Sequence, residues 1–442
     1  MTSETRGLLR KYLRFALATV SSLTVYSLYS MVDGFFIARG VNGYAMSAVN
    51  LVLPYTNLLF SISVLFAVGA STMIAIFMGQ GKTDEANRLF SQNTVLLVII
   101  GAVLSVTVLV FAEPIIAFLG ANETTHDYAR EYLIGIAPFS LCFIVSYNME
   151  VLIKTDGFPQ KAFGTVTAGC LCNCVLDYTA IFVLDMGVLG AALATGISQL
   201  IVCLIYLYHF LRCKTTFHFV RFRFEWGIYR RLLPLGFSEA VTEICTGLMI
   251  FVFNRVVLKK LGADGLVSYT IIAYVNTLVI NVLVGASAAA QPLVSFYHGK
   301  REKDTCKKLL RYALITAGCL EAAVFACIML GGNAIVGAYL NGAEKEIISA
   351  SASALRIYGV SYLILGFVLV IGGYLTATEH PVSALLISSG RGFVLQCAAL
   401  TVLSLSSNGQ LIWLAPTVSE ALCLAMALLL LKKVNILISP AI

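Results

Sequence analysis

Long stretches of hydrophobic residues follow one another along this chain, separated by short polar connections. About 20 apolar residues in a helix are enough to cross the roughly 30 Å hydrocarbon core of a bilayer. Because backbone groups in lipid must satisfy one another, uninterrupted stretches of this length predict helices rather than barrel strands. The pattern therefore predicts an all-α polytopic membrane protein with twelve spans, at residues 13–37, 49–78, 91–111, 128–153, 162–184, 188–211, 232–257, 266–297, 309–330, 349–376, 382–404 and 410–431.

The composition agrees with this pattern. Hydrophobic residues make up 59% of the chain and charged residues 12%, whereas an ordinary soluble domain carries roughly 25% charged residues. So few charges could not cover a water-facing surface, which disfavours a soluble helical protein. The first apolar stretch is too long for a signal-peptide core and lacks a small-residue cleavage pattern, so we expect it to remain as the first span.

The chain also repeats itself about half its length apart. The recurring motifs are Gly69-Ala70-Ser71 with Gly81-Lys82, which return as Gly285-Ala286-Ser287 with Gly299-Lys300, and residues 154–159, which align with 377–381 once one residue is skipped. Two similar halves in an apolar chain are typical of secondary transporters, whose substrate path lies between the halves. We expect two six-helix lobes related by a pseudo-two-fold axis along the membrane normal, at 1–211 and 232–442, joined by a flexible basic linker at 212–231.

The net charge of +7 is distributed asymmetrically. When the connections are assigned alternately to the two sides, most basic residues fall on one side, at Arg6, Arg10, Lys11, Arg14, Lys82, Arg88, Lys154, Lys161, residues 212–231, residues 300–311, Lys432 and Lys433. The other side has Arg39, Lys259, Lys260 and Lys345. This positive-inside bias predicts a multi-pass protein of the cell (inner) membrane with both termini in the cytoplasm, and it explains the charge without nucleic-acid binding.

Two carboxylates, Asp33 and Asp177, lie inside predicted spans of the first half. Charge inside a membrane costs several kcal/mol, so such a carboxylate is a candidate functional residue by default. Both lie about 9–12 Å from the outer ends of their spans, at 1.5 Å per residue, and Thr195 reaches a similar depth. Tyr29 and Asn173 each lie one helical turn from a carboxylate on the same face. The cluster offers oxygen ligands for a small cation, a counter-charge for an organic cation, or a proton acceptor.

The alternative is structural, with Asp33 capping its span and Asp177 hydrogen-bonded inside its bundle. When the halves are aligned, Asp33 falls opposite Asn254 and Asp177 opposite Ala399. Structural roles would more often be kept in both halves. We therefore favour a cation site in the first half that binds H⁺, or Na⁺ at Asp33, Asn173 and Asp177, and we expect no other metal and no cofactor.

Secondary candidates lie elsewhere in the chain. Glu239 and Glu243 are one turn apart in the seventh span, roughly 12–18 Å from its cytoplasmic end, where they either attract a cationic substrate or form a polar patch facing the cytoplasm. Asn254 and Gln291 are further polar candidates in the seventh and eighth spans.

Three more charged residues are open to two interpretations each. Glu150, at the inner end of the fourth span, either meets a cationic substrate or pairs with Lys154 one turn on. Arg391 and Glu420 either neutralise one another or contact the other lobe.

Several motifs resemble those of the multidrug and toxic compound extrusion (MATE) transporters, and the resemblance covers essentially the whole chain. The motifs are residues 29–37 (Tyr29 to Ile37), Asn173-x-x-x-Asp177 with Thr195, Gly79-Gln80-Gly81-Lys82, Gly157-Phe158-Pro159 and Gln291-Pro292. Tyr29, Asp33, Asn173, Asp177 and Thr195 together look like the cation-binding cluster of the DinF-like and archaeal branch. That branch often has a proline about fifteen residues before the first aspartate, where this chain has Ala18, so we expect no proline-driven kink there.

The resemblance implies a secondary active multidrug efflux antiporter that exports small organic cations in exchange for H⁺ or Na⁺, and we expect it to be a monomer in the lipid bilayer. No Gly-x-x-x-x-Gly-Lys-Ser/Thr motif is present, so an ion gradient rather than ATP should drive transport. One alternative is a flippase for lipid-linked oligosaccharides, which would need a strongly cationic cleft. A remote alternative is a membrane-embedded enzyme, for which the chain offers no catalytic constellation.

Overall fold

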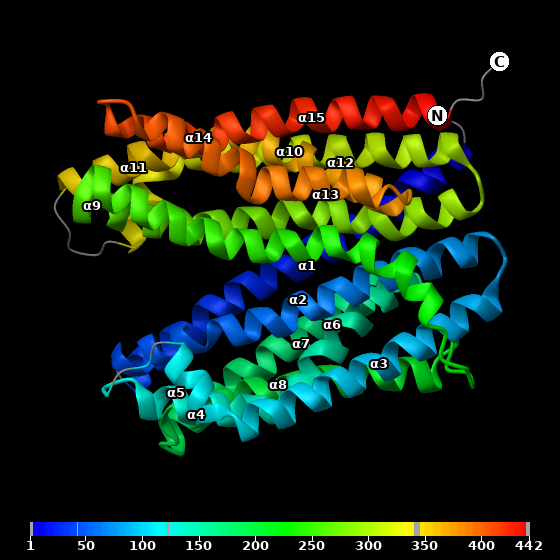
Figure 1. The fold of residues 1–442 in the computed structure, drawn as a ribbon, viewed down its shortest axis with the longest axis horizontal. Coiled ribbons are helices and arrows are strands. Elements are labelled where there is room, and N and C mark those ends of the chain that lie inside the picture. The colour runs from blue at the N-terminus through cyan, green and yellow to red at the C-terminus, as the bar shows by residue number, and fades with distance from the viewer. Residues whose placement is uncertain (1–2, 42, 120, 122, 340–344, 439–442) are drawn as a thin grey trace. The chain divides into compact units, whose positions relative to one another are not determined.

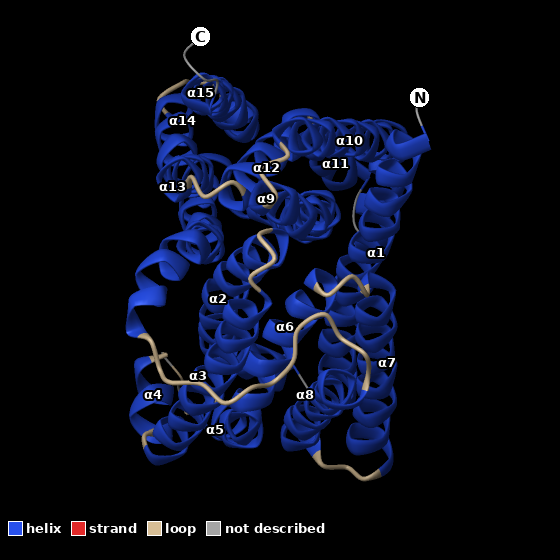
Figure 2. Cartoon of the chain, turned by 90° about the vertical axis from the view of Figure 1, so that its right-hand side faces the viewer, coloured by secondary structure: helices blue, strands red, loops and turns tan. Residues whose placement is uncertain are grey.

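The computed structural model describes residues 3–41, 43–119, 121, 123–339 and 345–438, and every regular element within these ranges is a helix (Figures 1 and 2). Eleven of the described helical stretches are long and apolar enough to cross a membrane, and they coincide with the second to twelfth expected spans. The expected first span lies within α1 (Ser3–Gly40). The prediction of an all-α polytopic membrane protein is confirmed.

The chain forms two compact units, residues 17–236 and residues 1–16 with 237–442. Helix α1 contributes to both units. Tyr12, Phe15 and Ala16 belong to a core with Leu293 and Leu309 of the second unit, although the expected first lobe included them. A helix that continues from one unit into the other shows no break in its hydrophobic pattern, so the sequence gives no signal at this boundary.

The first unit holds, after α1, the helices α2 (Gly43–Gly79), α3 (Thr83–Val110), α4 (Ala112–Phe118), α5 (His126–Ile136), α6 (Ser140–Thr155), α7 (Pro159–Tyr178) and α8 (Gly187–Arg212). The expected fourth span is divided between α5 and α6 by a 3₁₀ turn, η1 (Ala137–Phe139). Pro138 lies in this turn, where its missing N–H interrupts the helical ladder. A π-helical turn, η2 (Thr179–Val183), extends α7.

The second unit holds most of α9 (Tyr229–Gly299), then α10 (Lys303–Tyr339), α11 (Lys345–Gly359), α12 (Tyr362–Ala377), α13 (Pro381–Ser389), the π turn η4 (Gly390–Val394), α14 (Leu395–Ser404), the 3₁₀ turn η5 (Gly409–Leu414) and α15 (Ala415–Ile438). Helix α9 contains both the seventh and the eighth expected spans. They meet at Gly262, whose φ of 70° and ψ of −160° break the helix. A residue with a side chain disfavours this conformation, so glycine permits the bend.

The two halves share more than sequence motifs. Pro159 begins α7 and Pro381 begins α13. The offset between these prolines also aligns Pro138, in the break between α5 and α6, with Val360, between α11 and α12. The internal repeat therefore extends to the positions at which the fourth and tenth spans are interrupted.

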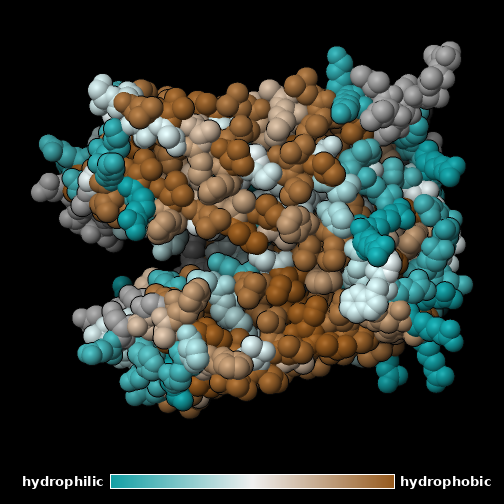
Figure 3. All heavy atoms as spheres, in the orientation of Figure 1, coloured by the Kyte–Doolittle hydropathy of each residue, from teal (hydrophilic) through white to brown (hydrophobic). Residues whose placement is uncertain are grey.

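The surfaces of the helices fit a lipid environment. Along α3 the side chains of Val95, Ile99, Val103, Val106 and Val110 are exposed, and their spacing places them on one face of the helix. Hydrophobic side chains cover the middle of the helices of each unit on the face shown in Figure 3, and hydrophilic side chains gather at the helix ends. Aliphatic side chains exposed in this way are favourable in a hydrocarbon core and costly in water.

The linker after α8 is fixed to the first unit, which differs from the flexible connection expected. Asn87, Ser91 and Gln92 of α3 accept hydrogen bonds from linker backbone N–H groups at 2.9, 2.9 and 3.1 Å. The ring of Phe217 is buried with its centroid 5.2 Å from that of Phe90. The polar start of α3 therefore replaces water as the partner of the linker backbone.

A second anchor lies beside the end of α6. Asp156 accepts hydrogen bonds from the backbone N of Thr216 at 2.7 Å and from the hydroxyl of Thr216. Its Oδ2 lies 3.4 Å from Nε2 of His209. Burial raises the pKa of Asp156, although the hydrogen bonds from Thr216 and His209 act in the opposite direction.

Candidate functional site

Asp33 of α1 and Asp177 of α7 lie next to one another in the first unit, with their side chains within hydrogen-bonding reach. The Asp177 side chain is fully buried and Asp33 is half-buried. Two bare carboxylates repel each other, so a hydrogen bond between them needs one proton. The pair can therefore hold a proton between two carboxyl groups.

Asn173 and Thr195 complete this arrangement from α7 and α8. Asn173 lies one turn before Asp177. With its amide oriented to satisfy both neighbours, its Nδ2 donates to Asp177 Oδ2 at 2.7 Å and its Oδ1 accepts from Thr195 N at 3.3 Å. Both residues are buried. The structure thus brings together Asp33, Asp177, Asn173 and Thr195, the residues that the depth argument placed at one level of the membrane.

Two tyrosines lie close enough to the carboxyl pair to interact with it electrostatically. Tyr29, one turn before Asp33 on α1, interacts electrostatically with both aspartates. Tyr132 of α5 is buried and also lies close enough to both aspartates to feel their charge, although the sequence did not single it out. Tyr132 follows Arg130 and Glu131 at the start of an apolar stretch, and no pattern distinguishes it from the other tyrosines of the chain.

The cluster offers chemistry for a small cation. Oδ1 of Asp33 and Oδ1 of Asp177 are buried without a hydrogen-bond partner among the described residues. A buried acceptor without a partner is costly, and a proton or a small cation would supply the missing interaction. Carboxylate, amide and hydroxyl oxygens are ligands that a hard cation such as Na⁺ accepts.

The candidates of α9 lie in the second unit and form a smaller group. Glu239 accepts a hydrogen bond from Gln291 Nε2 at 3.1 Å. Glu239 and Asn254 are half-buried, while Glu243, one turn after Glu239, is exposed. Carboxylates within membrane spans face the protein interior or a water-filled space rather than lipid. The exposed Glu243 therefore indicates a polar environment at this point of α9.

The structure answers two questions that the sequence left open. Glu150 accepts from Lys154 Nζ at 2.6 Å, and both side chains are largely buried. Arg391 Nε donates to Glu420 Oε1 at 3.0 Å, so these residues neutralise one another within the second unit.

Comparisons with known proteins agree with this architecture. The sequence model of the MatE family matches residues 18–179 and 240–398, one stretch in each half. The chain is 23% identical to the multidrug export protein MepA of Staphylococcus haemolyticus (strain JCSC1435) over 98% of this chain and 95% of the relative. It is 22% identical to MepA of Staphylococcus aureus (strain NCTC 8325 / PS 47), over 97% and 94%.

Solved structures show the same fold. An outward-facing multidrug resistance MATE family transporter of the MOP superfamily aligns with a TM-score of 0.92, 20% identity and 99% coverage of both chains. A MOP superfamily transporter from Pyrococcus furiosus Vc1 (DSM3638) aligns with a TM-score of 0.90, 21% identity and 98% coverage of both chains. Since the family model matches most of the chain in two stretches, the chain belongs to the MatE family, whose members are transporters and not enzymes.

Proposed function

We propose that this protein is a secondary active multidrug efflux antiporter that exports organic cations in exchange for H⁺ or Na⁺. The observation that carries the proposal is the Asp33–Asp177 pair, in which each carboxyl group has one buried oxygen without a partner among the described residues. The MepA relatives, which are named multidrug export proteins, support the export of several compounds.

The coupling cation binds at Asp33 and Asp177, with Asn173 and Thr195 orienting the buried carboxylate and Tyr29 beside it. When both carboxyl groups are ionised, the site carries two negative charges in a largely buried environment, and an entering H⁺ or Na⁺ relieves their repulsion. Antiport follows if this cation and the substrate favour different states of the transporter, because each then reduces the affinity for the other.

The organic cation is attracted by the carboxylates of α9. Glu243 is exposed within a membrane span, and Glu239 is oriented by Gln291. A cationic drug that leaves water gains from a nearby carboxylate, which offsets part of its desolvation. Asn254, on the same helix, provides a further polar contact.

The distribution of basic residues in the connections supports a location in the cell (inner) membrane with both termini in the cytoplasm, and we propose that the protein acts as a monomer. Pairing of Arg391 with Glu420 removes the mid-span positive charge on which a flippase for anionic lipid-linked sugars would depend. Export of organic cations is therefore the better-supported function.

The test is dye transport in proteoliposomes with a pH gradient or a sodium gradient imposed separately. We expect one of the two gradients to drive uptake of a cationic dye, and Asp33→Asn to abolish this dependence. Glu113→Gln serves as the control, because Glu113 is an exposed carboxylate of the same unit, paired with Arg130. If the rate of dye uptake by the unaltered protein were the same with and without either gradient, the antiport mechanism would be refuted.

A further inference from the structure

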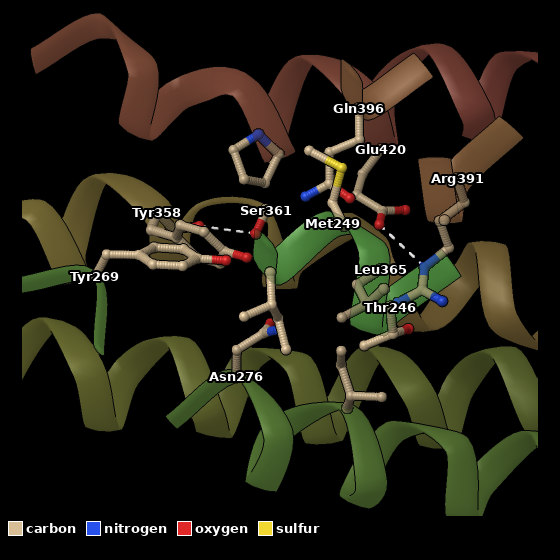
Figure 4. Close-up of a pocket in the computed structure, with 14 residues that line it drawn as sticks. Thr246, Met249, Tyr269, Asn276, Tyr358, Ser361, Leu365, Arg391, Gln396 and Glu420 are labelled. Carbon is tan, nitrogen blue, oxygen red and sulfur yellow. Dashed lines mark hydrogen bonds and ion pairs between the residues drawn. The ribbon is translucent and has the colours of Figure 1, made fainter. Parts of the chain in front are cut away.

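A polar cavity lies inside the second unit, between α9, α11, α12, η4, α14 and α15 (Figure 4). Its polar lining consists of Thr246, Tyr269, Asn276, Tyr358, Ser361, Arg391, Gln396 and Glu420. The cavity measures about 50 Å³, and one water molecule needs roughly 10–15 Å³ of such space. It therefore has room for a few water molecules or a small ion, and it is too small for a drug.

Arg391 lies where η4 approaches α9 and α15 closely. The residue lies in the π turn η4 between Gly390 and Gly392. A Cβ atom at Gly390 would lie 2.9 Å from Cε of Met426 in α15, and one at Gly392 would lie 2.8 Å from Cβ of Cys245 in α9. The flexible end of Met426 could move aside, whereas Cys245 Cβ could not do so without a shift of α9, so the close approach at Gly392 requires glycine. The close approach brings the backbone of Arg391 next to α9, and π turns of this kind are frequent at functional sites.

The cavity lining carries one charge of each sign, Arg391 and Glu420, and further carboxylates lie nearby on α9. The guanidinium of Arg391 donates to Glu420 at 3.0 Å, and each of the two side chains is only 10% exposed. The same guanidinium also attracts Glu239 and Glu243 of α9. Glu420 Oε2 is buried without a hydrogen-bond partner among the described residues. One fixed positive charge thus lies among three carboxylates.

The internal repeat shows that this pair is specific to the second half. The offset that aligns Pro159 with Pro381 places Gly169 opposite Arg391 and Ser198 opposite Glu420. The first unit therefore has no ion pair at these positions, and the second unit has neither aspartate of the first-unit cluster. At these aligned positions, only the second unit pairs a buried carboxylate with a covalently attached cation.

We propose that the guanidinium of Arg391 acts as a built-in cation: it occupies the position beside Glu420 that an exchangeable cation would otherwise take. Exchangeable cations are therefore confined to the first unit. Removal of the guanidinium should open a cation site at Glu420 that the unaltered protein lacks. A purely structural role would not produce such a site. Buried ion pairs contribute little net stability on average, so stabilisation alone is a weak explanation for this one.

The second unit contains a built-in reporter for the experiment. The chain has two tryptophans. Trp226 is 70% exposed, whereas Trp413 is buried with its ring centroid 6.5 Å from that of Tyr269 in the cavity lining. In the Trp226→Phe background, emission therefore reports on Trp413, and the first-unit site is left intact.

In this background, Arg391→Ala is titrated with methylguanidinium, which replaces the missing group. We expect a saturable change in Trp413 emission, absent from the Trp226→Phe parent, and a further Glu420→Gln substitution should weaken the apparent affinity at least about tenfold. Arg356→Ala is the matched control, because Arg356 of α11 donates to the backbone oxygen of Met329 rather than to a carboxylate. It should give no saturable response.

Three outcomes would overturn the proposal. They are a response of the parent equal to that of Arg391→Ala, no response of Arg391→Ala, and undiminished affinity after Glu420→Gln, which would place the cation at Glu239 and Glu243. If Arg391→Ala does not fold, Arg391→Gln is used instead, because glutamine keeps the stem of the side chain. Stabilisation of this variant against thermal unfolding by added guanidinium ion then supports the proposal, and its absence overturns it. None of these outcomes depends on Asp33, so failure here leaves the proposed antiport untouched.

Discussion

Replacing Asp177 by asparagine is the most direct perturbation of the first-unit cluster. Asp177 is fully buried, accepts from Asn173 at 2.7 Å and contacts Asp33. Asparagine keeps the shape of the side chain, an acceptor for Asn173 and a donor for Asp33, but removes the charge. We therefore expect the free energy of unfolding to change by no more than about 1 kcal/mol, the size of one ordinary hydrogen bond.

The effect on cation affinity should be much larger. A cation between two carboxylates loses one of its two attractions when Asp177 becomes neutral. At about 4 Å and an effective dielectric constant of about 20, one such attraction is worth ~4 kcal/mol, which corresponds to an affinity about a thousandfold weaker. Salt screens buried charges only weakly, so little of this loss should be masked at physiological ionic strength.

Two assays measure the loss. Cation-dependent thermal stabilisation of the purified protein reports affinity directly, since a ligand that binds only the folded state raises its stability. Gradient-driven dye transport in proteoliposomes reports coupling. Asp185→Asn is the matched control, because Asp185 is exposed in the turn after η2 and has a φ of 51°, which asparagine tolerates. Unaltered cation affinity and dye transport in Asp177→Asn would refute the assignment of the coupling site.

Three further outcomes are expected. Asp33→Asn should also abolish coupled transport, and the double variant with Asp177→Asn should be little worse than either single variant, whereas additive losses would indicate separate roles. Exchange of Glu239 and Glu243 for glutamine should narrow the range of exported dyes toward less charged compounds while cation-dependent stabilisation survives, and its loss would move the coupling site to α9. Burial raises the pKa of Asp156, so the folded state binds more protons than the unfolded one and stability falls as pH rises from about 4. Asp156→Asn should flatten this fall in thermal unfolding, and an unchanged slope would contradict the argument.

The sequence by itself determined the membrane class, the helical content and the repeat. Apolar stretches matched eleven spans closely, because each span is specified locally by its own run of hydrophobic residues. Local signals also indicated where chemistry could occur. Asp33 and Asp177 were singled out because charge is costly inside a membrane, and equal depth along their helices was enough to group them with Asn173 and Thr195.

Contacts between distant segments were decided by the tertiary structure. The sequence could not tell whether Arg391 pairs with Glu420, because this depends on the close packing of η4 against its neighbours, which Gly392 permits. It also gave no sign that Tyr132 lies beside the aspartates. Nor did it show that the polar start of α3 binds the linker, because Gln92 bonds to a backbone 133 residues away.

The division follows from the range of the forces involved. Burial of apolar surface in lipid acts on each stretch separately and leaves a periodic record along the chain. Hydrogen bonds and ion pairs in the interior require partners within about 3 Å, and that proximity is set by helix packing rather than by separation in sequence. The first turns of α1, where Tyr12 joins the core of the second unit, show the same limit, because an uninterrupted helical pattern carries no information about which core its ends enter.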